Sequence, residues 1–251
     1  MCTEPCAIWD IALVSPDSLL LANWTKKTIQ LVNSRTGSKL SEVSPPNGPI
    51  RICLLGGERA AVTIAGKQVQ LVHVRGGRLT LGTVLAVKAD CWGVTSSGDN
   101  VVVSYERPSW LEVMTTDGRL LHQYKESGAA QQFKFPDFLT TSSDGFIYTA
   151  DCHVSAIIKL DSSLQVLQKF SDPQLGRPFG LTTVNSDTLF ACNIDNNSIV
   201  HVNVNSGKVT TILGKEDGIV RPYVLAYCPQ QRTLFVCTDN KTDSIQVYQM
   251  N

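Results

Sequence analysis

The feature that most constrains the fold of this chain is a short pattern that recurs about every 40 to 45 residues. Its first marker is a pair of small turn residues between two apolar, strand-like runs. Glycine in such a pair supplies the positive φ that tight hairpins require. The five pairs are Thr36-Gly37, Gly76-Gly77, Asp117-Gly118, Ser162-Ser163 and Ser206-Gly207.

A second marker has the same period. In each unit one residue follows a Pro- or Cys-containing segment and opens an apolar run. We name these six positions the leading residues, and they are separated by 41, 42, 45, 42 and 44 residues. Two independent markers with one period indicate a true structural repeat. The leading residues are Trp9, Ile50, Trp92, Asp137, Phe179 and Tyr223.

Each unit is predicted to contain four short strands. The fifth unit shows them most clearly, at 179–184, 188–192, 199–204 and 208–213, with Asn, Ser, Asp and Gly between them. Four-stranded units of this length form propeller blades, which cover each other's apolar faces when they close into a ring. The sequence therefore predicts an all-β, six-bladed β-propeller of antiparallel strands in one domain, 1–251. Its approximate blades are 8–48, 49–88, 89–133, 134–176, 177–219 and 220–251.

The sixth unit is incomplete. Three strands are expected, at 223–227, 233–237 and 244–249, and no residues remain for a fourth. The outer edge of the third strand should then be open to another chain, with Cys2–Cys6 available to cover part of it. Pro5 removes one backbone donor from that segment. We expect the junction of the first and last blades to be the least stable part of the ring.

Composition and the N-terminal sequence limit the possible partners and the cellular compartment of the protein. Lys and Arg total 22 and Asp and Glu total 22, so no global charge attracts nucleic acid or an anionic membrane. The longest apolar runs are far shorter than the roughly 20 residues of a membrane helix, and the N-terminal sequence does not resemble a secretory signal. Six of the eight cysteines lie in or beside strand-like runs, without zinc spacing. We expect reduced, buried thiols and a cytoplasmic protein.

Unit four carries a recognisable motif. Ser143 to Asp151 gives an Asp-Gly turn and an apolar strand that ends in Asp, and Ile158 to Asp161 follows as an amphipathic strand. This pattern resembles the NHL repeat, and the chain is similar to the C-terminal propellers of tripartite-motif (TRIM/NHL) proteins. The resemblance implies a non-enzymatic module that recognises a protein or peptide for ubiquitin ligation. Units two and five lack the strand-ending Asp, and the chain has no RING or B-box zinc framework.

The candidate site is one mouth of the ring, where the leading residues gather. Each of their aromatic side chains either faces the mouth or wedges between blades. Basic residues close to these positions would give the mouth a positive charge. The predicted binding residues are Trp9, Arg51, Trp92, Lys134, Asp137, Arg177, Phe179, Arg221 and Tyr223, with Lys88 as a further basic residue.

Two other functions remain open. An aromatic and basic mouth can stack and bind single-stranded RNA, although the zero net charge counts against it, and no DNA binding is expected. A metal-dependent, lactonase-like hydrolase would need several acidic ligands, and only Asp10 and Asp137 lie near the mouth. The four histidines are in different units, and no nucleotide-binding motif is present. The sequence therefore predicts no cofactor, no metal and no membrane partner.

Overall fold

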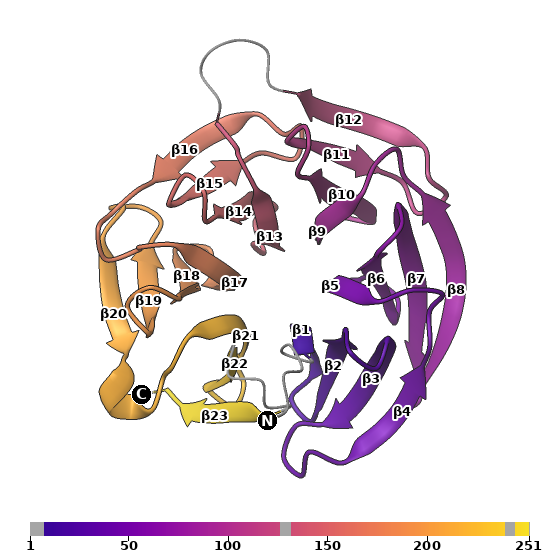
Figure 1. The fold of residues 1–251 in the computed structure, drawn as a ribbon, viewed down its shortest axis with the longest axis horizontal. Coiled ribbons are helices and arrows are strands. Elements are labelled where there is room, and N and C mark those ends of the chain that lie inside the picture. Colours follow the sequence, from indigo (N-terminus) through magenta and orange to yellow (C-terminus); the bar gives the residue numbers. More distant parts are fainter. Residues whose placement is uncertain (1–7, 126–131, 239–243, 251) are drawn as a thin grey trace.

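In a computed structural model the chain forms a ring of six sheets around a central channel (Figure 1). The structure describes residues 8–125, 132–238 and 244–250. No helix in these ranges is long and apolar enough to cross a membrane. The fold class predicted from the sequence is confirmed: within the described ranges, five sheets have four antiparallel strands and the last has three.

Successive strands of each sheet run from the channel outward (Figure 1). The inner strands are β1 (Ile8–Ser15), β5 (Pro49–Leu55), β9 (Cys91–Ser97), β13 (Pro136–Thr141), β17 (Pro178–Asn185) and β21 (Pro222–Cys228). The second strands are β2 (Ser18–Asn23), β6 (Arg59–Ile64), β10 (Asn100–Tyr105), β14 (Ile147–Asp151), β18 (Thr188–Asn193) and β22 (Thr233–Thr238). The third strands are β3 (Thr28–Asn33), β7 (Gln68–Arg75), β11 (Trp110–Met114), β15 (Ala156–Leu160), β19 (Ser198–Asn203) and β23 (Ile245–Gln249). The fourth strands are β4 (Lys39–Val43), β8 (Arg78–Ala86), β12 (Leu120–Lys125), β16 (Val166–Phe170) and β20 (Val209–Leu213), and a short 3₁₀ helix, η1 (Lys215–Asp217), follows β20.

The turns explain the first sequence marker. In the hairpin between β3 and β4, the side-chain oxygen of Asn33 accepts hydrogen bonds from the backbone N–H groups of Arg35 and Thr36. The chain then reverses at Gly37, whose φ is +69°. The β19–β20 hairpin repeats this arrangement with Asn203 and Gly207, at φ +71°. Asn in these turns holds the backbone, and Gly takes a conformation that other residues adopt at a cost.

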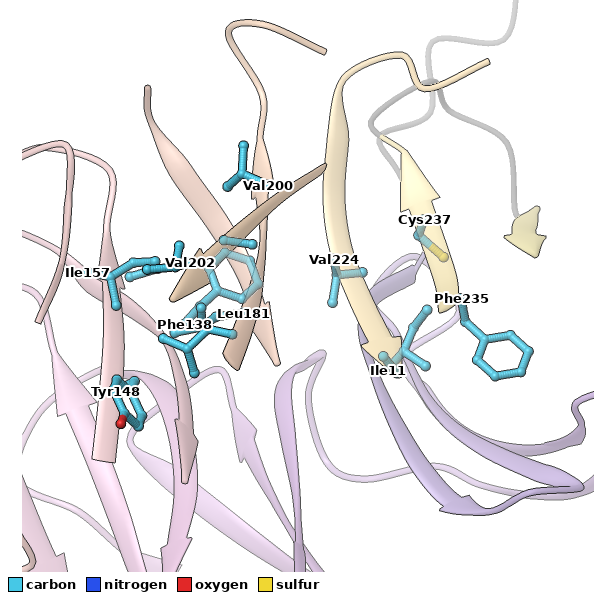
Figure 2. Packing of buried hydrophobic residues seen from close by; sticks show 14 of the residues in the cluster. Ile11, Phe138, Tyr148, Ile157, Leu181, Val200, Val202, Val224, Phe235 and Cys237 are labelled. Carbon is cyan, nitrogen blue, oxygen red and sulfur yellow. The ribbon is translucent and has the colours of Figure 1, made fainter. Parts of the chain in front are cut away.

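Burial follows strand position. Every residue of the second strand β14 is buried, because neighbouring sheets cover both of its faces. The fourth strand β16 is mostly exposed. Figure 2 shows side chains of the largest apolar cluster, among them Ile11, Phe138, Leu181 and Val224, which come from four different inner strands. The core is therefore made between blades.

Two glycines allow the inner strands to approach each other closely. A Cβ atom on Gly93 would lie 2.5 Å from the carbonyl oxygen of Asp137 on the next blade. A Cβ atom on Gly180 would lie 2.6 Å from Cα of Val224. Larger residues at either position would force the inner strands apart, so glycine here is a packing requirement.

The predicted register of the repeat is also confirmed. Each of the six leading residues is the second residue of an inner strand, so all lie at the same end of the channel. Every strand lies within the blade limits expected from the sequence. In the described residues the sixth blade has the three strands that were predicted. The expected role of Cys2–Cys6 at its edge lies outside the described residues.

The cysteines behave as predicted. The six in the described residues are free and buried, and they come from five blades: Cys53, Cys91, Cys152, Cys192, Cys228 and Cys237. Burial raises the pKa of the Cys53 and Cys91 thiols to about 12. These thiols are inert apolar packing groups.

Candidate functional site

The candidate site lies at the end of the channel that carries the leading residues. We name this end the mouth face. It consists of the loops that lead into the inner strands and the turns that join second to third strands. All six inner strands leave regular pairing near their leading residue, as between Pro136 and Phe138 and between Ile8 and Asp10. Such irregularities re-aim side chains at the ends of strands.

A row of rings crosses the mouth face. Trp24 stacks on Trp9 with ring centroids 4.2 Å apart, and Trp9 is nearly parallel to Trp92 at 6.4 Å. Phe135 meets Trp92 edge-on at 5.2 Å, and the His153 ring lies 5.4 Å from Phe135. The first four are half-buried and His153 is exposed. We name these five residues the aromatic row.

Asp151, the last residue of β14, holds one end of the aromatic row in place. Its Oδ2 accepts hydrogen bonds from the backbone N–H groups of Lys134 at 2.6 Å and Phe135 at 2.8 Å. Its Oδ1 accepts them from His153 at 3.0 Å and Val154 at 3.3 Å. The strand-ending Asp of the sequence motif therefore joins the loop before β13 to the turn after β14, and it positions both rings.

The other end of the row is supported by close packing. A Cβ atom on Gly48 would lie only 2.5 Å from the Trp24 ring. The ring is therefore enclosed by the Gly48 backbone and by Trp9. Because the Trp24 ring is already fixed by its neighbours, a ligand that binds to the aromatic row would cost little further side-chain entropy.

Beneath the mouth face, Arg51 is buried and 1 % exposed. Its Nη2 donates to Oδ2 of Asp137 at 2.6 Å and to the hydroxyl of Tyr223 at 3.1 Å. Its Nη1 donates to the carbonyl of Trp9 at 2.8 Å, and the guanidinium lies 3.7 Å from the centre of the Phe138 ring. One side chain thus joins four inner strands, and Arg51 and Asp137 stabilise the ring from within.

Asp10 belongs to the same buried cluster. Its two carboxyl oxygens accept the backbone N–H groups of Ile11 at 2.9 Å and Ile52 at 2.7 Å. Burial raises the pKa of Asp10 to about 7, although the nearby Arg51 guanidinium opposes that rise. Burial also raises the pKa of Asp137, again against Arg51. Two carboxyl groups around one guanidinium leave a negative charge that a proton on Asp10 removes.

The channel is lined by free strand edges. Each inner strand ends its sheet, so one edge of its backbone faces the channel (Figure 1). Asp10 and Arg51 satisfy some of these backbone groups, as the bonds to Ile52 and Trp9 show. A cavity of about 210 Å³ adjoins Asp10 and Arg51 and is also lined by Thr95 and Thr140. Its polar walls suit water or a small polar molecule.

Of the remaining predicted site residues, Lys134 adjoins the aromatic row, and Phe179, Tyr223 and Arg221 are not part of it. Phe179 and Tyr223 are half-buried and pack with Phe138, with ring centroids 5.4 to 5.9 Å apart. They wedge between blades, which was one of the two interpretations left open. Arg221 is exposed, and its backbone N–H donates to Asn197. Lys134 is exposed beside Phe135.

Ion pairs offset several of the basic side chains expected at the mouth. Arg177 lies 2.7 Å from Asp195, and Lys88 lies 3.2 Å from Glu112. The Arg51 charge is compensated by Asp137 below the surface. The positive mouth envisaged from the sequence is therefore largely neutralised at these three positions.

The predicted binding residues did not include Trp24, Phe135 or His153. His153 is the histidine on the mouth face, since His73, His122 and His201 lie on the third and fourth strands β7, β12 and β19. The sequence feature that could have indicated His153 is Asp151 at the end of its strand. An Asp in that position caps the following turn, and the side chains of that turn then lie at the mouth face.

The donor groups do not fit a metal. In the described ranges no group of three or more His, Cys, Asp or Glu side chains gathers closely enough to hold an ion. Asp10 and Asp137, the two acidic candidates, are already engaged by backbone N–H groups and by Arg51. The metal-dependent form of the hydrolase hypothesis therefore finds no ligand set here.

Among solved structures, the chain is similar to a streptogramin B lyase, with 14 % identity and a TM-score of 0.72 over 100 % of this chain and 85 % of that one. It is also similar to a catalytically inactive His-to-Ala variant of virginiamycin B lyase from Staphylococcus aureus with quinupristin, with 16 % identity, a TM-score of 0.70 and coverage of 99 % and 86 %. Hydrazine synthase of Kuenenia stuttgartiensis aligns at 17 % identity and a TM-score of 0.69, over 94 % of this chain and 75 % of that one. No family model and no curated protein matches the chain.

These comparisons correct two expectations. The predicted TRIM/NHL recognition module for ubiquitin ligation is wrong, because a streptogramin B lyase and a virginiamycin B lyase are among the similar propellers and no family model matches. The prediction that the chain is not an enzyme is overturned by the same finding. The strand-ending Asp misled because its role here is structural: Asp151 ties the loop before β13 to the turn after β14. The likeness itself establishes the fold.

Proposed function

We propose that this protein is an enzyme that performs acid–base chemistry on a small molecule bound against the aromatic row. The observation that carries the proposal is the exposed His153 at the end of a half-buried platform of rings. The aromatic row recognises a flat apolar or aromatic group, and His153 supplies the proton transfer. Both roles are provided by side chains that the fold already holds in position.

The recognition half of the proposal rests on ring geometry. Trp9 and Trp92 are nearly parallel and half-buried, so each keeps part of its ring exposed beside the other. Aromatic side chains bind flat apolar groups through large contact areas and stacking, and a few polar groups then fix orientation. The neutralised charges of Arg177 and Arg51 favour a substrate of low charge.

The chemical half rests on His153. Histidine is the side chain most often used for general acid–base catalysis near neutral pH. The Asp151 carboxylate holds the His153 backbone, and Phe135 flanks the ring, so the imidazole is placed at the end of the aromatic row. An imidazole there is able to remove a proton from a carbon next to a carbonyl, or from a water that attacks an ester. The first reaction is an elimination and the second is a hydrolysis.

The similar lyases support the first of these reaction types, and a histidine-to-alanine change inactivates one of them. We therefore expect this chain to open a cyclic ester that carries aromatic groups. The test is incubation of the purified protein with quinupristin and with simple aryl lactones, followed by mass spectrometry. Elimination opens the ring without a change of mass, whereas hydrolysis adds the mass of one water.

The matched variants are His153→Ala and His201→Ala. We expect the first to lower turnover by about 10²- to 10⁴-fold. The second should leave it unchanged, because His201 lies on β19 away from the mouth face. Quenching of tryptophan fluorescence by the substrate should be lost in Trp92→Leu. Undiminished turnover in His153→Ala, or the absence of both turnover and quenching with every ester, contradicts the proposal.

A further inference from the structure

The cavity in the channel lies below the mouth face. It has a volume of about 210 Å³ and is bounded by all six inner strands, and none of the six leading residues is among the described residues that line it. It begins at Asp10 and Arg51 and reaches Leu13, Leu54 and Tyr227, which lie close to the ends of β1, β5 and β21. The cavity therefore extends from the Arg51 cluster toward the face opposite the mouth.

The end of this cavity next to the mouth face carries ionisable groups that the chemistry proposed above does not use. Asp10 and Arg51 line it and are only 9 % and 1 % exposed. Arg51 makes one hydrogen bond to Asp137, through Nη2 and Oδ2. In the described residues neither Nε of Arg51 nor Oδ1 of Asp137 has a hydrogen-bond partner. One guanidinium therefore faces two carboxyl groups, and its contact with Asp137 is a single bond.

Few titratable groups surround Asp10. The strand β2, which pairs with β1, carries none, and β13 brings Asp137. The others come from β5 and β21: Arg51, Cys53, Tyr223, Tyr227 and Cys228. Among these groups Arg51 alone is a cation. With both carboxyl groups ionised, the cluster therefore has one negative charge in excess.

A proton is one way to remove this excess charge. Burial raises the pKa of Asp10 to about 7, so the carboxyl group holds a proton below that pH and loses it above. A buried charge that nothing compensates is costly. A cation that enters the cavity above pH 7 takes the place of the proton, whereas an anion is disfavoured by the same balance of charges.

The cavity walls suit a cation that donates hydrogen bonds. Each oxygen of Asp10 accepts one backbone N–H group, which leaves a lone pair on both. Thr140 and Thr182 also line the cavity, and the free edges of the inner strands turn backbone carbonyl groups toward it. An ammonium group needs only a few such oxygen acceptors. A metal ion lacks ligands here, because the described residues bring together no three His, Cys, Asp or Glu side chains.

We propose that the channel binds a small protonated amine, or ammonium itself, with its nitrogen at the Asp10 carboxylate. Its charge replaces the proton of Asp10, which passes to solvent, and its N–H groups donate to Asp10 and to the channel oxygens. A cavity of roughly 150 Å³ is enough for a molecule the size of benzene, so a small amine fits together with water. This site is separate from the aromatic row and does not depend on the chemistry proposed at the mouth face.

The first test compares the melting temperature of the full-length protein in four chloride salts at equal ionic strength. Ammonium and methylammonium, at about tenfold excess over Kd, should raise it by about 3–6 °C at pH 8 and by little at pH 5. Potassium and choline donate no N–H hydrogen bonds, so both should have little effect at either pH. Equal shifts in potassium or choline overturn the proposal.

The matched variants are Asp10→Asn and Asp187→Asn. Asp187 is exposed on the turn between β17 and β18, away from the cavity lining. We expect Asp10→Asn to lose the ammonium effect at pH 8, because it removes the charge that the cation compensates, and Asp187→Asn to keep it. An ammonium effect that persists in Asp10→Asn overturns the proposal.

Proton release tests the exchange in the wild type alone. Since the pKa of Asp10 is about 7, methylammonium binding at pH 7 should release about half a proton per site, and almost none at pH 8.5. Isothermal titration calorimetry in two buffers of different ionisation enthalpy measures this number. Binding without proton release at pH 7, or the absence of any binding at pH 8, overturns the proposal.

Discussion

Arg51 and Asp137, which are 86 residues apart in the sequence, meet in a buried ion pair with 2.6 Å between Nη2 and Oδ2. They join the inner strands of blades two and four below the mouth face. We expect Arg51→Met to destabilise the protein by about 3–5 kcal/mol, since it leaves Asp137 buried without its partner. The melting temperature should fall by about 10 °C or more.

The control is the double variant that combines Arg51→Met with Asp137→Leu. Removing both charges leaves no uncompensated carboxylate, so the double variant should be more stable than Arg51→Met alone. Thermal and urea unfolding of the two variants measure the difference. A double variant that is less stable than the single one would show that the ion pair does not determine stability at this site.

Asp10 gives stability a defined pH dependence. Its pKa rises from 3.8 in the unfolded chain to about 7 in the fold. The native state therefore holds a proton that the unfolded state releases as the pH rises from about 4. This contribution is fully present below pH 4 and is lost as the pH rises through about 7, with a loss of up to about 4 kcal/mol. The measurement is urea unfolding between pH 4 and 8, compared with Asp10→Asn.

The comparison uses the slope of stability with pH, because Asn at position 10 also changes the hydrogen bonds to Ile11 and Ile52. The variant should be more stable relative to wild type at pH 8 than at pH 4. Parallel curves for the two proteins would show that Asp10 does not titrate in this range.

The thiols provide a test of burial. In the folded protein, Cys53, Cys91, Cys152, Cys192, Cys228 and Cys237 should resist an aqueous thiol reagent, because they are buried. After denaturation without reductant, all eight cysteines of the chain should react. A shortfall of two or more would reveal a disulfide and would contradict the expectation of a reducing, cytoplasmic setting.

RNA should bind weakly and only at low salt. Zero net charge and the pairing of Arg177 with Asp195 leave few cations to contact phosphates. The measurement is a salt titration of single-stranded RNA binding, with Arg177→Ala and Arg221→Ala as variants. Tight, sequence-selective binding at physiological salt that both variants abolish would reverse this prediction.

Much of the fold could be predicted because propeller blades repeat locally. The fifth blade has strands at Pro178–Asn185, Thr188–Asn193, Ser198–Asn203 and Val209–Leu213, each within one or two residues of the expected ranges. Turn residues such as Asn203 and Gly207 make these boundaries visible in sequence. The common position of the leading residues followed from the period alone.

The site was harder to predict because it depends on contacts between blades. From sequence alone Arg51 is expected at the surface, because its buried partners Asp137 and Tyr223 come from distant blades. His153 and Phe135 are separated in the sequence by the whole β13–β14 hairpin, and hydrogen bonds to Asp151 hold the backbones of both. Sequence spacing predicted which end of the ring to inspect, and tertiary packing decided which side chains face outward there.

The most direct test of the proposed function is the separate effect of two variants on turnover of an aromatic cyclic ester. His153→Ala should lower kcat by about 10²- to 10⁴-fold with little change in KM, because it removes the proton-transfer group. Trp92→Leu should raise KM with kcat nearly unchanged, because it removes part of the binding platform. Equal kinetic constants for the wild type and His153→Ala would contradict the assignment of the chemistry to the mouth face.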